Sequence, residues 1–281
     1  MSEIARAERP LDLSLSDAEL ERVRDHVTAF VREQTDAAGV DEVVLGLSGG
    51  IDSTLTASLA VEALGADGVY GLVMPSRVNP EASMSDAERV ASELLEIEYD
   101  VIAIDPILDA VLAQLPGVES ADVDDATIQT AVGNARARIR AVLSYFEANR
   151  RSALVFGTGN RSEAAVGYFT KYGDGAVDCH PIATLYKGQV RQLAAHVGVP
   201  QHYVEKPASA ELWADHSDVG ELGIDYPTLD SILALHVDGP LSPSATARAI
   251  GVDQSVVDRV RGMYEASAHK RAAPPGPAPL F

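Results

Sequence analysis

The sequence has little cysteine and no long apolar run. Its single cysteine is Cys179, which cannot form an internal disulfide or a cysteine-rich metal site and is typical of a reducing compartment. A transmembrane helix needs about eighteen consecutive apolar residues, and no such run occurs. The first residues, MSEIARAERP, lack the apolar core of a secretory signal. We therefore expect a cytoplasmic protein that does not bind a membrane.

Lysine is also scarce: only four of the 22 basic residues are lysines, against 42 acidic residues and a net charge of -20. The largest basic cluster is the short run ARARIR, so a nucleic-acid-binding face is not expected. The apolar fraction of 46% argues against disorder. We interpret the acidity as adaptation to strong salt, because molar ionic strength screens charge repulsion beyond about 3 Å.

Buried apolar runs alternate with amphipathic segments along the chain. Two of the expected helices begin with SDAE, at Ser16 and Ser85, which is a capping box. The expected strands are 43–47, 69–74, 99–104, 153–158 and 202–206, and the expected helices are 16–37, 53–64, 85–95, 126–150 and 187–197. This alternation predicts an α/β fold, a doubly wound parallel sheet of Rossmann-like type with helices on both faces.

We expect a single domain over 1–281. Residues 1–40 form its N-terminal helical segment, and the Pro-rich tail 272–281 is expected to be disordered. Residues 207–225 show no clear period, so a long loop is expected there. Such a loop in a compact domain is usually a lid or a binding element.

The stretch LGLSGGIDST, residues 45–54, follows the first expected strand and opens a helix. This is the usual place for a phosphate in a doubly wound sheet, since free backbone N–H groups and the helix dipole favour an anion. The glycines allow a close backbone approach. Neither GxxxxGK[ST] nor GxGxxG is present, and Asp52 in place of lysine implies that a metal ion neutralises the phosphates. The alternative is an ordinary turn with Asp52 or Ser53 as the helix N-cap.

The motif SGGIDS resembles the signature of the ATP pyrophosphatases, which split ATP between its α and β phosphates. Four further stretches resemble NAD synthetases, and the resemblance runs from about Asp41 to Arg271. They are GTGNRSEAAVGYFTKYGDGAVDCHPIATLYKGQVRQLA (157–194), KPASAEL (206–212), ELGIDYPTLD (221–230) and AHKR (268–271). The resemblance implies synthesis of NAD from deamido-NAD, ATP and ammonia, with Mg²⁺, by a homodimer.

The resemblance also assigns site residues. The ATP-binding positions it implies are Gly46, Leu47, Ser48, Gly49, Gly50, Ile51, Asp52, Ser53, Thr158, Lys187 and Ser209. Asp52 and Glu163 correspond to the Mg²⁺ ligands. For Glu163 the residues alone leave an alternative, because Asn160 and Glu163 also form a good capping pair at a helix start.

The positions implied to contact deamido-NAD are Arg138, Lys171, Asp174, His269 and Lys270. Three of the four lysines thus fall in motif positions. Asp52 and Lys187 are the implied catalytic residues, and Asp174 is the candidate that deprotonates ammonium. One departure is Thr130, which stands where many relatives have an aromatic residue, so the resemblance implies no aromatic stacking on the substrate there.

The 126–150 helix carries Arg138 and an apolar face formed by Val132, Ile139, Val142, Leu143 and Phe146. Packing against the same helix of a partner would bury this face and share the dinucleotide site between subunits. Packing on the chain's own sheet is the alternative.

Other activities fit less well. Cys179 is expected to be a packing residue, and we see no room for the cysteine-nucleophile domain of glutamine-using synthetases. A tRNA-thiolating enzyme would want paired cysteines and a basic face, which the chain lacks. The synthetase portion of GMP synthase and a nucleotide sensor without turnover remain as alternatives.

Overall fold

The central strands follow the apolar runs of the sequence. The computed structural model describes residues 4–78, 81–115, 126–208 and 217–278. Within them lies a four-stranded, fully parallel sheet in the order β3-β2-β1-β4. Its strands are β1 (Val43–Leu47), β2 (Val69–Val73), β3 (Glu98–Val101) and β4 (Leu154–Phe156). The α/β class and the parallel sheet are therefore confirmed.

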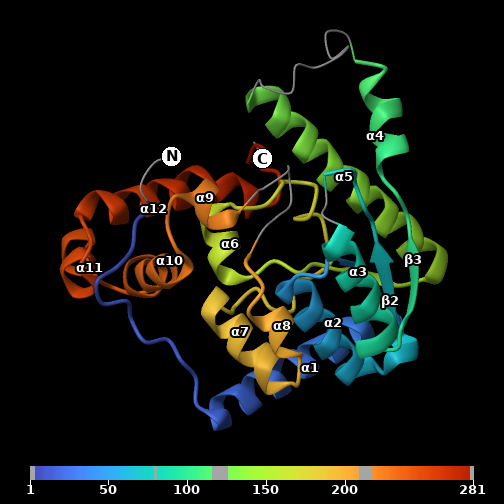
Figure 1. Ribbon diagram of the computed structural model, residues 1–281, viewed down its shortest axis with the longest axis horizontal. Coiled ribbons are helices and arrows are strands. Elements are labelled where there is room, and N and C mark those ends of the chain that lie inside the picture. Colours follow the sequence, from blue (N-terminus) through green and yellow to red (C-terminus); the bar gives the residue numbers. More distant parts are fainter. Residues whose placement is uncertain (1–3, 79–80, 116–125, 209–216, 279–281) are drawn as a thin grey trace.

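Helices cover both faces of this sheet (Figure 1). On one face, Val43, Leu45 and Leu47 pack against α1 (Asp17–Ala38), α2 (Ile51–Leu64) and α7 (Lys187–His196). The same face receives α3 (Glu81–Arg89) and the π-helical stretch Val90–Leu94 that continues it. On the other face, Val44 and Leu72 pack against α4 (Asp105–Leu112) and α5 (Ala126–Arg151). Alternate residues of β1 thus face opposite layers, as the pleat requires.

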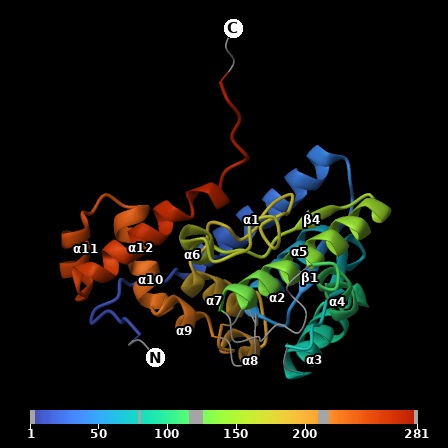
Figure 2. The same cartoon turned by 90° about the horizontal axis from the view of Figure 1, so that it is seen from above.

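A third apolar cluster, separate from the two faces of the sheet, holds the C-terminal helices beside the sheet layer (Figures 1 and 2). Leu229, Ile232 and Val260 are fully buried in it. The elements beyond β4 other than α7 are α6 (Arg161–Val166), α8 (Gln201–Val204), α9 (Asp218–Leu222), α10 (Tyr226–Ile232), the π-helical stretch Leu233–Val237, α11 (Pro243–Ile250), α12 (Gln254–Ala266) and the 3₁₀ turn Ala268–Lys270.

Two details of the predicted elements are wrong. Residues 202–206 are not a strand, because Gln201–Val204 form the helix α8. Pro200 has a φ of -56° and its carbonyl accepts from Tyr203 N, so the chain turns helical at once. The second SDAE is not a capping box either, because α3 begins at Glu81 and Ser85 lies inside the helix. The first is confirmed at Ser16.

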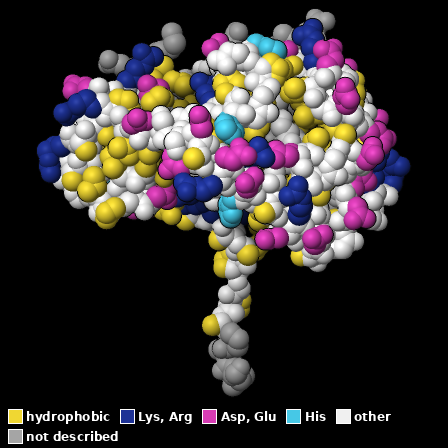
Figure 3. Space-filling model, turned by 90° about the horizontal axis from the view of Figure 1, so that it is seen from below, with side chains coloured by type: hydrophobic (Ala, Val, Ile, Leu, Met, Phe, Trp, Pro, Cys, Tyr) yellow, Lys and Arg dark blue, Asp and Glu magenta, His cyan; other side chains and the backbone are white. Residues whose placement is uncertain are grey.

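The predicted loop 207–225 also contains a short helix, α9. Ser217 caps α9 and Asp225 caps α10, so the helical part of this region begins at Asp218. The segment 209–216 lies outside the described residues, as does part of the Pro-rich tail. No described helix is both long and apolar enough to cross a membrane. Figure 3 shows Asp and Glu side chains spread over the face that it displays.

Candidate active site

A cavity of about 870 Å³ opens where β1 and β4 end. The chain leaves β1 toward β2 on one side and later returns to β4 on the other side, so the crevice lies at the point where the strand order reverses. Ligands of doubly wound sheets bind at this point, outside the carboxyl ends of the strands. The cavity is lined by the 46–53 loop, by residues 157–159 after β4, by one face of α5 and by the 167–177 segment.

The loop after β1 has the geometry of an anion site. Gly49 has a φ of 72°, the left-handed region that glycine adopts without a steric penalty. Gly50 is the N-cap of α2, so the alternative of Asp52 or Ser53 as N-cap is wrong. Within the loop, Ser48 N donates to Ser53 Oγ at 3.3 Å and Gly50 N donates to Ser48 Oγ at 3.2 Å. A phosphate oxygen could replace these hydroxyls as the acceptor.

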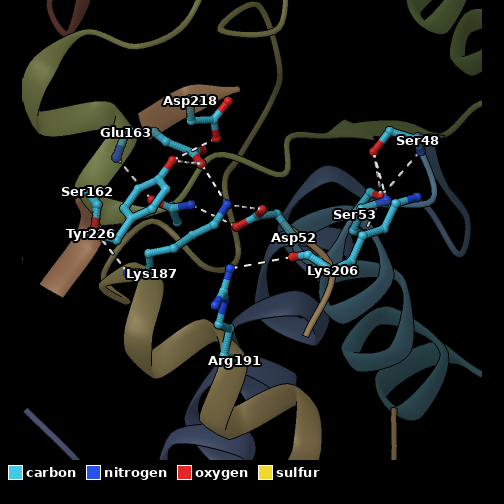
Figure 4. Close-up of polar contacts among 12 residues, drawn as sticks. Ser48, Asp52, Ser53, Ser162, Glu163, Lys187, Arg191, Lys206, Asp218 and Tyr226 are labelled. Atoms are coloured by element: carbon cyan, nitrogen blue, oxygen red, sulfur yellow. Dashed lines mark hydrogen bonds and ion pairs between the residues drawn. The ribbon is translucent and has the colours of Figure 1, made fainter. Parts of the chain in front are cut away.

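Asp52 is instead part of a polar cluster that joins three elements (Figure 4). Lys187 Nζ, at the start of α7, donates to Asp52 Oδ2 at 2.5 Å and to Glu163 Oε1 at 2.9 Å. Asn160 Nδ2 donates to the other Asp52 oxygen at 2.7 Å. The segment after β4 thus contacts the first turn of α2 across the crevice.

Glu163 is not the second half of a capping pair. Asn160 does cap α6, because its side chain accepts from Glu163 N at 3.0 Å. The Glu163 carboxylate, however, turns to Lys187 and to the Tyr226 hydroxyl at 3.3 Å. The two carboxylates of Asp52 and Glu163 therefore converge on one cationic group.

Burial and charge oppose each other in this cluster. Burial disfavours the charged Lys187, which is 3% exposed, but Asp52 and Glu163 outweigh this effect and the pKa of Lys187 is raised. Burial also raises the pKa of Glu163, an effect that Lys187 opposes and Asp52 adds to. Lys187 is therefore an ammonium ion at neutral pH and holds the carboxylates together.

A buried carboxylate fixes the backbone that carries Lys187. Asp230, 4% exposed on α10, accepts from Ser162 Oγ at 2.5 Å and from Gly188 N at 3.1 Å. Ser162 Oγ in turn accepts from Lys187 N at 2.9 Å. Asp230 thereby ties the first turns of α6 and α7 together, the two turns from which Glu163 and Lys187 project.

The residues expected to contact the dinucleotide are held by hydrogen bonds to the backbone of neighbouring segments. Lys270 Nζ donates to the carbonyls of Gly167 and Phe169, and Lys171 Nζ donates to the carbonyl of His269 at 2.6 Å. The Asp174 carboxylate accepts from Thr170 N at 2.9 Å. The short C-terminal turn and the 167–175 segment thus hold each other in place.

Arg138 takes a different position from the other candidates. It lies on the exposed side of α5, and its Nη2 donates to the Lys171 carbonyl at 3.2 Å. The residues of α5 that line the cavity include Thr130, Gly133, Ala137, Arg140 and Ser144 instead. Thr130, which stands where an aromatic residue was expected from the resemblance, therefore lines the cavity itself.

Comparisons with known proteins agree with this geometry. A family model described as NAD synthase matches residues 23–274. The chain belongs to the NAD synthase family. The NH3-dependent NAD(+) synthetase of Halobacterium salinarum is 56% identical over 268 residues, which is 95% of this chain and 97% of the relative. The NH3-dependent NAD(+) synthetase of Aeropyrum pernix is 44% identical over 262 residues, covering 93% and 90%.

Solved structures share the fold. The NMN synthetase from Francisella tularensis has a TM-score of 0.77 and 32% identity, and covers 95% of this chain and 100% of that one. The NH3-dependent NAD synthetase from Campylobacter jejuni, in complex with the nitrate ion, has a TM-score of 0.74 and 30% identity, covering 92% and 99%.

The structure brings most of the candidate residues to one cavity. Those that line it are Gly46, Leu47, Ser48, Gly50, Ile51, Asp52, Ser53, Thr158, Glu163, Lys171, Asp174, Lys187 and Lys270. Gly49 lies in the same loop. Arg138 and His269 lie beside the cavity, where both contact Lys171. Ser209 is outside the described residues.

Several residues of the site were not predicted from the sequence. Asp218 lines the cavity and accepts from the Tyr226 hydroxyl at 2.9 Å, while Asp230 accepts from Gly188 N, next to Lys187. These residues stand at helix starts or inside a helix, where an acidic residue has ordinary explanations. Lys206 carried a stronger signal, because it is the remaining lysine of a chain that has only four.

Cys179 is a packing residue, as predicted. It forms a single parallel bridge with Phe156 at the edge of the sheet and packs against the core around β1. Burial, together with the neighbouring Asp178, raises the pKa of its thiol to about 12. A thiol with such a pKa is not a nucleophile at neutral pH.

Proposed function

We propose that this protein catalyses the ATP-dependent amidation of deamido-NAD with ammonia, giving NAD, AMP and pyrophosphate. One observation carries the proposal: a phosphate loop and a set of cationic side chains for a dinucleotide line the same cavity in a member of the NAD synthase family. The share of each chain covered by the Halobacterium relative supports the ammonia-dependent form. Asp52, Glu163 and Lys187 argue against a sensor without turnover.

The chemistry follows from the carboxylate that must be amidated. A carboxylate is a poor electrophile, so the nicotinate group is first activated as an acyl adenylate at the α-phosphate of ATP. The backbone amides of residues 48–50 and the Lys187 ammonium would stabilise the charge that grows on the leaving pyrophosphate. Ammonia then attacks the acyl carbon and AMP leaves. Asp174, which lines the cavity, is our candidate for the group that takes the proton from ammonium.

The residues also fit a magnesium ion. Asp52 and Glu163 supply carboxylate oxygens that already converge on one cation, the Lys187 ammonium. Mg²⁺ is commonly held by one or two carboxylates together with substrate phosphates. Asp52 and Glu163 would hold the ion, which would supply charge neutralisation of the phosphates.

The experiment is a measurement of NAD formation by purified protein at high KCl, with deamido-NAD, ATP and Mg²⁺. We expect turnover with ammonium chloride and almost none with glutamine, because the only thiol of the sequence is half-buried and its pKa is raised to about 12, so it stays protonated. AMP and pyrophosphate should form in equal amounts, and chelation of Mg²⁺ should stop the reaction. Comparable turnover with glutamine at low ammonium would contradict the proposal.

The likeness to an NMN synthetase makes a mononucleotide product the second candidate. The same assay with nicotinate mononucleotide in place of deamido-NAD separates the two. We expect a kcat/KM at least about tenfold higher for deamido-NAD, since the mononucleotide lacks the AMP half and its contacts. The reverse order would assign the chain to NMN synthesis.

We further propose that the enzyme is a homodimer with a shared dinucleotide site. The apolar face of α5 divides in two: Ile139 is 9% exposed and packs on the sheet with Val132 and Leu143, whereas Val142 and Phe146 are each 69% exposed. Arg138, Val142 and Phe146 are spaced four apart and therefore share one stripe of the helix. A partner's α5 on this stripe would bury both apolar side chains and place Arg138 at the interface.

A complementation experiment tests the shared site. Arg138→Ala and Asp52→Asn should each be inactive alone. Heterodimers of the two, co-expressed with different tags and purified through both, should recover about half of the wild-type activity, because one site per dimer combines an intact Asp52 with the partner's intact Arg138. Pure heterodimers without activity would mean that Arg138 acts within its own chain.

A further inference from the structure

All four lysines of the chain line the same cavity: Lys171, Lys187, Lys206 and Lys270. Elsewhere the basic residues are arginines, and acidic residues outnumber basic ones by 42 to 22. Three of these lysines have roles in the proposed reaction. Lys206 has none so far, although it faces the phosphate loop.

Lys206 lies just after α8, at the start of a segment far from the loop in sequence. Its Nζ donates to the carbonyl of Gly49 at 3.2 Å and to Asp86 Oδ2, on α3, at 2.9 Å. The side chains of the ion pair are 26% and 18% exposed, so the pair is partly shielded from water. Figure 4 shows Lys187 extending toward Asp52 while Lys206 extends toward Ser48 and Ser53.

The charge balance at the loop calls for a second cation. A triphosphate carries several negative charges, and the loop has Asp52 where phosphate loops usually have lysine. The charge of Lys187 is already balanced by Asp52 and Glu163. Lys206 reaches the loop at the Gly49 carbonyl, and its ammonium is paired with Asp86, a carboxylate from α3.

We propose that Lys206 binds the polyphosphate of ATP and the pyrophosphate product, and that Asp86 holds its ammonium beside the loop when no nucleotide is bound. This proposal rests on the function proposed above, because it assumes that the loop binds ATP. Lys206 supplies from a distant segment the ammonium that the loop itself lacks. Binding exchanges the Asp86 carboxylate for a phosphate oxygen on the same Nζ.

A purely structural role makes a different prediction. If the Lys206–Asp86 pair only ties α3 to the Gly49 carbonyl, removing either partner should disturb the loop to a similar degree. If Lys206 binds phosphate, the two substitutions act in opposite directions. Lys206→Met removes the ligand, whereas Asp86→Asn releases the ligand from its competitor and removes a negative charge near the phosphates.

The test is isothermal titration calorimetry of the full chain at fixed high KCl and Mg²⁺, with ATP, inorganic pyrophosphate and AMP as separate probes. Lys206→Met should weaken ATP and pyrophosphate binding roughly tenfold or more, the usual effect of losing a hydrogen bond to a charged group. AMP binding should change little. Asp86→Asn should bind ATP and pyrophosphate as tightly as wild type or tighter.

Two further variants complete the design. Arg89→Met is the matched control, because Arg89 also pairs with Asp86, at 3.6 Å, but lies outside the cavity lining. It should bind all three probes as wild type does. Lys206→Arg keeps the charge and should retain ATP binding within a few-fold, so it tests the proposal even if Lys206→Met unfolds.

Three outcomes would overturn the inference. They are unchanged ATP and pyrophosphate affinity in Lys206→Met, equal weakening in Lys206→Met and Asp86→Asn, and loss of binding in Lys206→Arg comparable to that in Lys206→Met. In each case wild-type NAD synthesis would leave the proposed function standing. A wild-type protein that binds neither ATP nor pyrophosphate would instead refute the function itself.

Discussion

Asp230 shows how a single buried residue links site geometry to pH. Its carboxylate ties α6 to α7 through Ser162 and Gly188, and burial raises its pKa from 3.8 to about 6 despite these hydrogen bonds. The folded state therefore binds more protons than the unfolded state between these values. The contribution of Asp230 to the free energy of unfolding is complete below about pH 4 and is lost as pH rises through about 6. Compared with Asp230→Asn, wild type should lose stability over this range, as measured by urea unfolding at constant KCl.

The Asp238→Asn variant should show the opposite pH dependence of stability in the same urea unfolding experiment. Burial would raise the pKa of Asp238, but Arg161 and Tyr186 outweigh burial and lower it. Its contribution is therefore present above the unfolded value and is lost as pH falls. If the difference between wild type and Asp230→Asn does not vary with pH, Asp230 does not titrate with the pKa assigned here.

At the level of elements, the strands that the sequence predicted correctly are those whose apolar pattern fits only one kind of secondary structure. VVLGL and VYGLV are apolar on both faces, as buried parallel strands must be, and the order of helices and strands around them was correct. Residues 202–206, HYVEK, were ambiguous because two adjacent apolar residues in so short a segment suit a strand or a helical turn equally. In the structure the Pro200 carbonyl accepts from Tyr203 N and Val204 N, and the helical turn buries Tyr203 and Val204.

The residues of the candidate site also fall into two groups, those that a motif within one segment can predict and those that it cannot. The phosphate loop is continuous in sequence, so a motif was enough to find it. The partners of Asp52 are not: Asn160 and Lys187 lie 108 and 135 residues away. Lys206 and Asp218 likewise reach the cavity through tertiary packing, since α8 packs on α7 and α10 packs on both α6 and α7. No spacing rule within a segment encodes such contacts.

For the whole molecule, the net charge of -20 is the dominant property. Acidic residues exceed basic ones by 42 to 22, so a net excess of 20 negative charges remains uncompensated and carboxylates repel one another in dilute buffer. The Debye length falls from about 30 Å at about 0.01 M salt to about 3 Å at about 1 M. The relative from Halobacterium salinarum is consistent with a protein adapted to the molar end of this range.

We therefore expect the melting temperature at pH 7 to rise steeply between dilute and molar KCl, as followed by differential scanning fluorimetry. Near pH 4.6, the sequence pI, the net charge is close to zero and the same KCl series should give a much shallower rise. The comparison matters because salt also stabilises proteins by strengthening apolar burial, an effect that does not depend on net charge. A flat profile at pH 7 would remove salt adaptation as the cause of the acidity, and equal slopes at both pH values would assign the stabilisation to apolar burial. A steep slope only at pH 7 would identify carboxylate repulsion as the term that salt relieves.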